Sequence, residues 1–133
     1  MAAADFEDVC AAGAPRILVL IVEDEVLIRM LLADALRQAD YDVIEAASGD
    51  EAMSVLDTSP SPDILITDVR MPGSIDGLEL AANVRRTKPR LKVIVTSGHA
   101  GPDQALDLAD AFLPKPYELR RIVERVRTLA ESR

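Results

Sequence analysis

Short apolar segments alternate with amphipathic segments along the chain after residue 15. Residues 17–22 form an unbroken run of Ile, Leu and Val, which is typical of a strand buried on both faces. Shorter runs at residues 64–67, 91–96 and 111–113, and a weaker one at 42–47, predict four further strands. The pattern therefore indicates five strands with longer segments between them.

Within those longer segments, apolar residues recur at helical spacing. Ser48, with Glu51 three residues later, has the capping-box pattern of a helix start, and Asp76 is the expected N-cap of a helix ending near residue 86. A short helix is expected over residues 103–110. The first predicted helix has the stripe Ile28, Leu31, Leu32, Ala35, Leu36 and Ala39. The last has the stripe Leu119, Ile122, Val123, Val126, Leu129 and Ala130.

Strands that alternate with helices require a parallel sheet covered on both faces. We therefore expect one α/β domain at residues 16–133, with a doubly wound, five-stranded parallel sheet and helices on both sides. Residues 1–15 precede the alternation and carry three acids but no base. They are expected to form a flexible acidic N-terminal extension.

Composition narrows the possible functions. The 133 residues include 23 acidic and 15 basic side chains, a formal charge of −8, which argues against nonspecific nucleic-acid binding. The single cysteine, Cys10, excludes an internal disulfide framework and is interpreted as an incidental thiol in a reducing compartment. No apolar run approaches a membrane span, and the N-terminus lacks the basic start of a signal peptide. We expect a cytoplasmic protein without nucleic-acid or membrane partners.

Polar residues directly follow the apolar runs. Glu23 and Asp24 follow the first predicted strand and Asp68 follows the third, while Ser97 and Lys115 come after the fourth and fifth. In an open α/β sheet the carboxyl ends of the strands form the ligand-binding edge. Three carboxylates, a hydroxyl and an ammonium group are therefore expected to meet at one edge.

Carboxylates about 5 Å apart repel by roughly 3 kcal/mol per pair at an effective dielectric of 20. A raised pKa on one acid or a bound divalent cation relieves this repulsion. The expected ligands are hard oxygen atoms, with neither His nor Cys among them, so Mg²⁺ fits better than zinc or copper.

This arrangement resembles the CheY-like receiver domain of two-component response regulators. The resemblance covers residues 16–130, and its specificity comes from five motifs occurring in order at strand ends. The matching residues are Glu23, Asp24, Asp68, Met71, Pro72, Asp76, Gly77, Ser97, Lys115 and Pro116.

The resemblance implies that Asp68 accepts a phosphoryl group from a histidine kinase or a histidine phosphotransfer protein. Asp24, Asp68 and the backbone carbonyl of Arg70 would bind Mg²⁺ directly, while Glu23 would act through water. Ser97 would hydrogen-bond to the phosphoryl group. The metal site and the phosphorylation site would therefore share Asp68.

Further residues receive roles from the same resemblance. Lys115 would pair with the phosphoryl group, and the Lys115–Pro116 bond would be cis. Phosphorylation would draw Ser97 inward, and Phe112 would rotate into the space it leaves. His99 is expected on the surface, two residues past Ser97, where receivers tune the lifetime of the phosphoryl group. The expected protein is a switch rather than an enzyme with a separate substrate.

Two departures from the family pattern affect these expectations. The loop has one residue more than usual between Pro72 and Asp76, which should alter the loop and leave the acids in place. Ser97 and Lys115 are only 18 positions apart, so the helix between the fourth and fifth strands should be short or irregular. Signal output is therefore the least transferable part of the resemblance.

Several alternatives remain open. Asp24 and Asp76, each taken alone, are as compatible with a simple helix cap as with a role in the site. Thr96 is the alternative to Ser97 as the hydroxyl that faces the site. The chain is expected to be a stand-alone receiver, monomeric or weakly dimeric, that contacts an unknown downstream protein, or else a receiver from a hybrid kinase. A Mg²⁺-dependent aspartyl-phosphate phosphatase would need a second Asp where Arg70 stands. A flavin-binding module would place a phosphate group beside Glu23 and Asp24, which would repel it.

Overall fold

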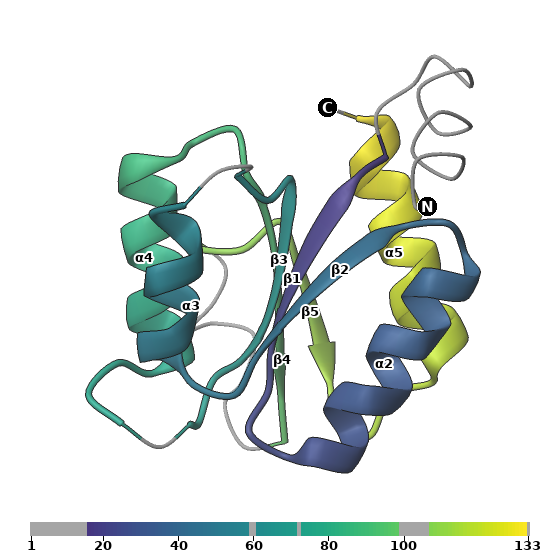
Figure 1. Ribbon diagram of the computed structural model, residues 1–133, viewed down its shortest axis with the longest axis horizontal. Coiled ribbons are helices and arrows are strands. Elements are labelled where there is room, and N and C mark those ends of the chain that lie inside the picture. Colours follow the sequence, from purple (N-terminus) through teal and green to yellow (C-terminus); the bar gives the residue numbers. More distant parts are fainter. Residues whose placement is uncertain (1–15, 59–60, 72, 99–106, 133) are drawn as a thin grey trace, which may run out of the picture.

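The computed structural model describes residues 16–58, 61–71, 73–98 and 107–132 (Figure 1). The strands are β1 (Leu18–Val22), β2 (Asp42–Ala46), β3 (Ile64–Asp68), β4 (Lys92–Ser97) and β5 (Ala111–Pro114). The helices are α2 (Val26–Gln38), α3 (Gly49–Leu56), α4 (Gly77–Thr87) and α5 (Leu119–Glu131). All five predicted strands are confirmed, with ends that differ by at most one residue. The expected acidic extension at residues 1–15, with Cys10, lies outside the described residues, as does His99.

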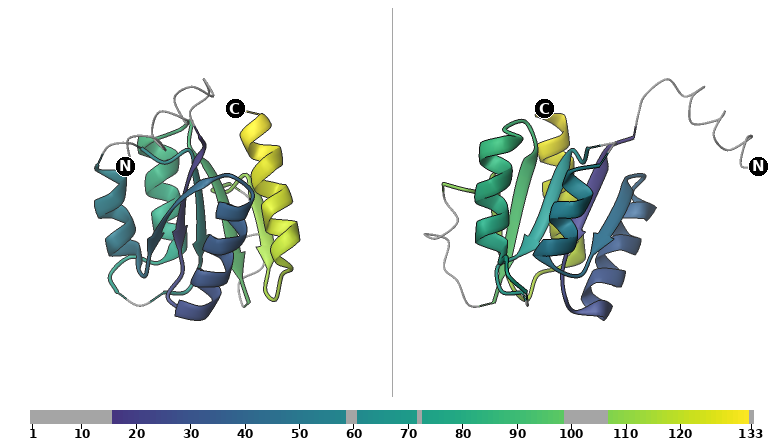
Figure 2. Two further views of the ribbon diagram at one scale, coloured as in Figure 1. Left: turned by 45° about the vertical axis from the view of Figure 1, so that its right-hand side comes forward. Right: turned by 60° about the vertical axis from the view of Figure 1, so that its left-hand side comes forward.

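The strands form one sheet in the order β2-β1-β3-β4-β5, and every neighbouring pair is parallel. Helices α2 and α5 cover one face, and α3 and α4 cover the other (Figures 1 and 2). The predicted doubly wound α/β fold is therefore confirmed. Because Val22 pairs with Thr67 and Asp68 with Thr96, the carboxyl ends of the three central strands lie at the same edge.

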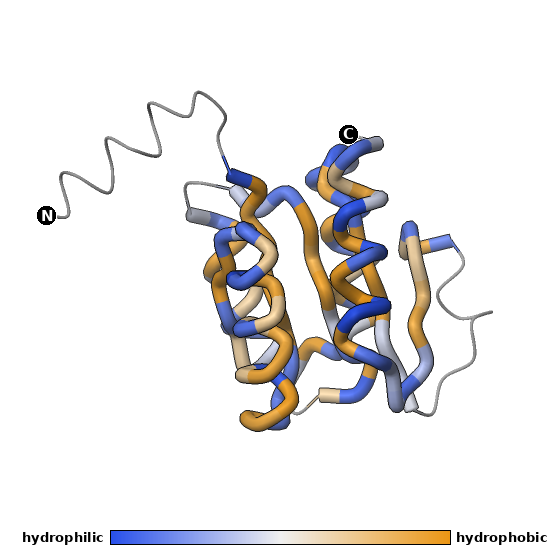
Figure 3. The backbone as a smooth tube through the Cα atoms, turned by 90° about the vertical axis from the view of Figure 1, so that its right-hand side faces the viewer, coloured by the Kyte–Doolittle hydropathy of each residue, from blue (hydrophilic) through white to orange (hydrophobic). Residues whose placement is uncertain are grey.

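Each face of the sheet has its own hydrophobic core. The α3–α4 core includes Leu20, Leu65 and Val95, and the α2–α5 core includes Ile21, Ile66 and Ile94, so alternate residues of each strand enter opposite cores. Figure 3 shows the central strands hydrophobic along their length, while the helices alternate between hydrophobic and hydrophilic. This burial on both faces explains why the strands read as continuous apolar runs.

The stripe predicted for α2 is only partly buried. Leu32 and Leu36 are buried as expected, but Leu31 is 48% exposed. Ala33, which the stripe omitted, is fully buried instead. The helix faces the sheet through a narrower surface than its apolar residues suggest.

Of the three residues considered as helix N-caps, Ser48 and Asp76 begin a helix and Asp24 does not. The Ser48 side chain accepts a hydrogen bond from the Glu51 N–H at 3.1 Å, so it caps α3. Asp76 forms a complete capping box with Glu79 at the start of α4. Asp24 does not cap α2, because the N-cap position belongs to Glu25.

The prediction of a helix over residues 103–110 is wrong for residues 107–110, which form a turn and a bend. The Asp110 N–H donates to the Val93 carbonyl, and the Asp110 carboxylate accepts the Val93 N–H, both at 2.8 Å. Arg85 also donates to the Asp110 carboxylate at 3.1 Å. These contacts fix Asp110 beside β4, directly before β5 begins at Ala111. The first part of the expected helix lies outside the described residues.

None of the helices in the described part of the chain is long and apolar enough to cross a membrane.

Candidate functional site

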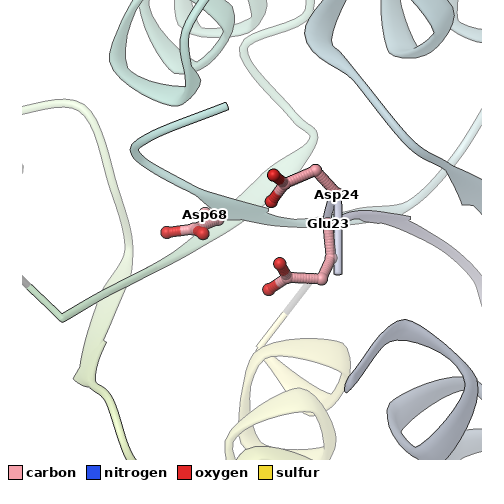
Figure 4. A group of neighbouring side chains, drawn as sticks. All are labelled: Glu23, Asp24 and Asp68. Carbon is pink, nitrogen blue, oxygen red and sulfur yellow. The ribbon is translucent and has the colours of Figure 1, made fainter. Parts of the chain in front are cut away.

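Three carboxylates meet at the carboxyl edge of the sheet. Glu23 and Asp24 lie in the turn after β1, and Asp68 is the last residue of β3. One carboxylate oxygen from each lies within 4.8 Å of the others. Figure 4 shows Glu23 and Asp24 directed toward the side on which Asp68 lies. Glu23 and Asp68 are buried and Asp24 is exposed, so the cluster opens to solvent on one side.

Lys115 joins this cluster from the far end of the chain. Its Nζ atom lies 2.8 Å from Oε1 of Glu23 and 3.0 Å from Oδ2 of Asp68. The pairing of β4 with β5 positions it, since the Lys115 N–H donates to the Ser97 carbonyl at 2.9 Å. The ammonium group therefore bridges the two buried acids.

The charges at the site do not balance. Three carboxylates and one ammonium group give the site a formal charge of −2. Burial raises the pKa of Glu23 above its usual value, because the charged form loses water, and the Lys115 ammonium only partly opposes this. Burial alone would lower the pKa of Lys115, but hydrogen bonds and charge attraction from Glu23 and Asp68 outweigh it and raise that pKa.

The residues fit a hard divalent cation. The cluster offers carboxylate oxygens alone, with neither nitrogen nor sulfur donors, and it carries an excess of two negative charges. Such oxygens suit Mg²⁺, which keeps several water ligands and uses one or two carboxylates. The open side at Asp24 leaves space for those waters.

The turn after β1 is fixed by its neighbours. The Glu23 N–H donates to the Ala46 carbonyl at 3.1 Å, and the Glu25 N–H donates to the Glu23 carboxylate at 3.1 Å. Arg29 of α2 donates to the Glu23 carbonyl at 2.8 Å and pairs with Glu45 of β2 at 3.3 Å. Sequence reasoning missed Arg29, because its only signal was one arginine on a helix.

The turn after β3 is tightly packed. The Gly77 N–H donates to the Val69 carbonyl at 2.8 Å, and a methyl group on Gly77 would overlap the backbone carbonyl of Asp68. Glycine at this position therefore lets α4 begin directly against Asp68. Arg70 lies exposed in the same turn.

The predicted switch residues occupy one face of the sheet. Ser97 is buried, and strand alternation puts it on the same face as Val93 and Val95, which belong to the α3–α4 core. Phe112 is half-buried against that core and pairs with Val95 in the sheet. Thr96 is equally buried but follows the alternation of Ile94, toward α2 and α5.

Tyr117 is a neighbour of the site that sequence reasoning did not assign to it. Burial raises the pKa of Tyr117 to about 12, with a further contribution from the negative charge of Glu23. The Lys115–Pro116 peptide that precedes it is cis, as expected. The signal available in the sequence was the nearness of Tyr117 to Lys115.

An apolar groove adjoins the carboxylates. It has a volume of about 460 Å³ and lies between α2 and the start of α5. Beside it, α2 exposes four large apolar side chains whose exposed fractions range from 48% to 68%: Val26, Leu27, Met30 and Leu31. The groove is lined by Ile28, Leu31, Lys115, Pro116, Tyr117 and Leu119.

Comparison with known proteins identifies this arrangement. The sequence model of the response regulator receiver domain matches residues 19–127, most of the chain. The chain belongs to the receiver domain family of two-component signalling. Receiver domains are regulatory switches, and the receiver fold has the same five-stranded architecture as described above.

Curated relatives of this receiver domain include a sensor kinase and a transcriptional regulatory protein. This chain is 41% identical over 119 residues to the sensor kinase CckA of Brucella abortus, covering 86% of this chain and 12% of that protein. It is 39% identical over 120 residues to the transcriptional regulatory protein BaeR of Escherichia coli O6:H1, covering 88% of this chain and 48% of BaeR. The chain thus spans less than half the length of either relative.

Solved receiver domains are similar in fold to most of this chain. A CheY-like receiver domain from Methanospirillum hungatei has a TM-score of 0.81 at 25% identity, covering 88% of this chain and 96% of that one. The response regulator protein TrrA of Thermotoga maritima, solved in complex with Mg²⁺-BeF, has a TM-score of 0.76 at 31% identity. That match covers 85% of this chain and 98% of TrrA.

Proposed function

We propose that this receiver domain is a phosphorylation switch in which Asp68 accepts a phosphoryl group in a Mg²⁺-dependent step. The observation that carries the proposal is the network in which Lys115 bridges Glu23 and Asp68 beside the exposed Asp24. A carboxylate that is buried, paired with an ammonium group and open on one side is suited to attack a phosphoryl group and to hold the product.

In the proposed step, a carboxylate oxygen of Asp68 bonds to the phosphorus atom as the bond from phosphorus to the donor's imidazole nitrogen breaks. The bonding electron pair remains with the imidazole, which takes up a proton. Asp24, Asp68 and the Arg70 carbonyl would hold Mg²⁺ directly and Glu23 through water. When bound, Mg²⁺ neutralises charge on the phosphoryl oxygens.

Ser97 and Lys115 would then bind the phosphoryl oxygens. The aspartyl phosphate carries almost two negative charges in place of one. Lys115 is already within 3.0 Å of Asp68, so it supplies a positive charge without rearrangement. Phe112 shares the α3–α4 face with Ser97, which supports the proposal that an inward movement of Ser97 lets Phe112 rotate.

The proposed phosphodonor is a histidine kinase or a histidine phosphotransfer protein that docks on α2. Helix α2 exposes Val26, Leu27 and Met30 beside the apolar groove, and Lys115 lies both in that groove and in the carboxylate cluster. An apolar helix face of the donor bound here would bring its phosphohistidine toward Asp68. Exposed apolar patches of this kind are typical of interaction sites.

The remaining parts of the proposal follow from the acidic composition of the chain and from its family. We place the protein in the cytoplasm as a monomer or weak dimer, acting on an unknown downstream protein and not on nucleic acid or membrane. It catalyses only its own phosphorylation and dephosphorylation. The similarity to the sensor kinase CckA supports a second version, in which the chain is the receiver of a hybrid kinase.

Intact mass spectrometry tests the proposal. Incubation with Mg²⁺ and acetyl phosphate should add one phosphoryl group to the protein. Asp68→Asn should take up none, while Asp34→Asn, which changes an exposed acid on α2, should behave as wild type. An unchanged mass with several donors, or equal labelling of Asp68→Asn, would contradict the proposal. Steady hydrolysis of varied phosphate esters would favour a phosphatase instead.

A further inference from the structure

The loop between β3 and α4 is held by a helix from another part of the chain. Asp50, the second residue of α3, accepts two hydrogen bonds from Ser74. The Ser74 hydroxyl donates to Oδ1 at 2.7 Å, and the Ser74 N–H donates to Oδ2 at 3.3 Å. Hydrogen bonds to a charged carboxylate are about twice as strong as neutral ones. Asp50 therefore fixes both the backbone and the side chain of Ser74.

The surrounding backbone is shaped to permit this contact. Gly73 has a φ of +104°, and a methyl group there would lie 2.7 Å from Oδ2 of Asp50. A methyl group on Gly49 would lie 2.5 Å from the Ile75 carbonyl oxygen. Two glycines thus let the loop lie directly against the start of α3. Residues 73–75 occupy the part of the sequence where this chain has its extra residue.

The same loop bears a proposed metal ligand. Arg70, whose carbonyl is expected to bind Mg²⁺, lies between the tight turn at Val69 and the segment held by Asp50. At the other end of the loop, Gly77 is bonded to Val69, and Asp76 caps α4. Those contacts stay within the loop and its own helix, whereas Asp50 ties the loop to α3. A longer loop has more conformations to restrict, so an outside anchor has more effect on the Arg70 carbonyl.

We propose that Asp50 is a positioning residue for the metal site, acting through Ser74 on the loop that carries the Arg70 carbonyl. This inference rests on the proposed function and adds a residue outside the ligand set. Groups that orient metal ligands typically contribute about 10-fold to 100-fold to affinity. Because Asp50 acts through the backbone, we expect about a 10-fold loss of Mg²⁺ affinity in Asp50→Ala, the lower end of that range.

The first test measures the loop without any metal. In amide hydrogen exchange followed by NMR, Asp50→Ala and Ser74→Ala should speed exchange at residues 73–77, whereas Ser74→Thr, which keeps the hydroxyl, should not. Glu51→Ala is the matched control, because Glu51 is an exposed acid in the same helical turn that accepts the Ala47 N–H. Wild-type exchange rates in the Asp50→Ala loop would overturn the inference.

The second test measures Mg²⁺ binding by calorimetry. The Mg²⁺ Kd should rise about 10-fold in Asp50→Ala and stay unchanged in Glu51→Ala. At saturating Mg²⁺, Asp50→Ala should still take up a phosphoryl group from acetyl phosphate, which separates positioning from chemistry. An unchanged Kd in Asp50→Ala would overturn the inference. A wild-type protein that binds Mg²⁺ but takes up no phosphoryl group would contradict the proposed function, while these Kd values still decide the role of Asp50.

Discussion

The Nζ atom of Lys115 lies 3.0 Å from Oδ2 of Asp68, although 47 residues separate them in the chain. Pairing of β3 with β4 and of β4 with β5 brings the two residues to the same edge of the sheet. Lys115 also contacts Glu23, so one ammonium group stabilises two buried carboxylates that would otherwise repel each other.

Replacing Lys115 with Met should destabilise the protein by about 2 kcal/mol at pH 7, because Glu23 and Asp68 would lose their shared partner. Glu23 has a raised pKa and would then hold its proton more tightly in the folded state than in the unfolded state. Excess proton binding by the folded state favours folding as the pH falls. The loss measured by urea unfolding should therefore be smaller at pH 5. Lys92→Met is the control, and an equal loss for Lys115→Met at both pH values would contradict the explanation.

Replacing Gly77 with Ala should destabilise the protein although alanine favours helices by about 1 kcal/mol over glycine. Gly77 is the first residue of α4, and its added methyl group would overlap the Asp68 carbonyl. The matched control is Gly98→Ala, whose methyl group would sit 3.8 Å from the Lys115 side chain in ordinary contact. Thermal unfolding should show a lower Tm for Gly77→Ala only. A Tm for Gly77→Ala at or above wild type would rule out the close contact.

Magnesium should stabilise the wild-type protein and leave Asp24→Asn unaffected. A ligand at 100 times its Kd adds about 2.7 kcal/mol to the free energy of unfolding. Without Mg²⁺, Asp24→Asn should be at least as stable as wild type, because one of three crowded carboxylates is neutralised. Urea unfolding with and without Mg²⁺ measures both effects, with Asp34→Asn as the control. A full Mg²⁺ effect in Asp24→Asn would exclude that carboxylate as a ligand.

Tyr117 should ionise near pH 12, about two units above an unperturbed tyrosine. In a Tyr41→Phe background the absorbance of the phenolate reports Tyr117 alone. Adding Glu23→Gln should lower the midpoint, because Glu23 contributes to the shift. The folded state retains this proton longer than the unfolded state, so the free energy of unfolding should fall as pH rises from 10 to 12. A midpoint near 10 with native circular dichroism would contradict the burial of Tyr117.

Replacing Leu27 with Glu should slow phosphoryl transfer from a cognate histidine donor at least 10-fold, which corresponds to about 1.4 kcal/mol. Leu27 is 68% exposed on α2, so the change should leave stability and labelling by acetyl phosphate unaltered. Ala82→Glu places the same charge on the exposed side of α4 and serves as the control. Equal transfer rates for both variants would argue against docking on α2.

The strands could be predicted because each is buried on both faces, so runs such as residues 17–22 and 64–67 are apolar throughout. Parallel strands share one carboxyl edge, and this geometry was enough to bring Glu23, Asp24, Asp68 and Lys115 together. Helix α2 was harder, because spacing defines a stripe but does not fix how much of it the sheet covers. Leu31 fits the stripe and is nevertheless exposed.

Contacts between distant side chains could not be predicted in the same way. The hydrogen bonds from Arg29 to the Glu23 carbonyl and from Ser74 to Asp50 depend on how a helix and a loop approach each other. The segment at residues 107–110 was expected to be helical because local pattern was the only guide. Its path depends on Asp110 bonding to Val93, 17 residues earlier in the chain.

The sheet also separates two surfaces of the protein. The apolar groove lies beside α2 and α5, whereas Phe112 packs against the core under α3 and α4. These two pairs of helices lie on opposite faces of the sheet (Figure 2). A donor seated in the groove leaves the α3–α4 side uncovered. Under the proposed function, the donor and a downstream protein that binds the α3–α4 side would therefore not compete for space, and both could be bound while the phosphoryl group is transferred.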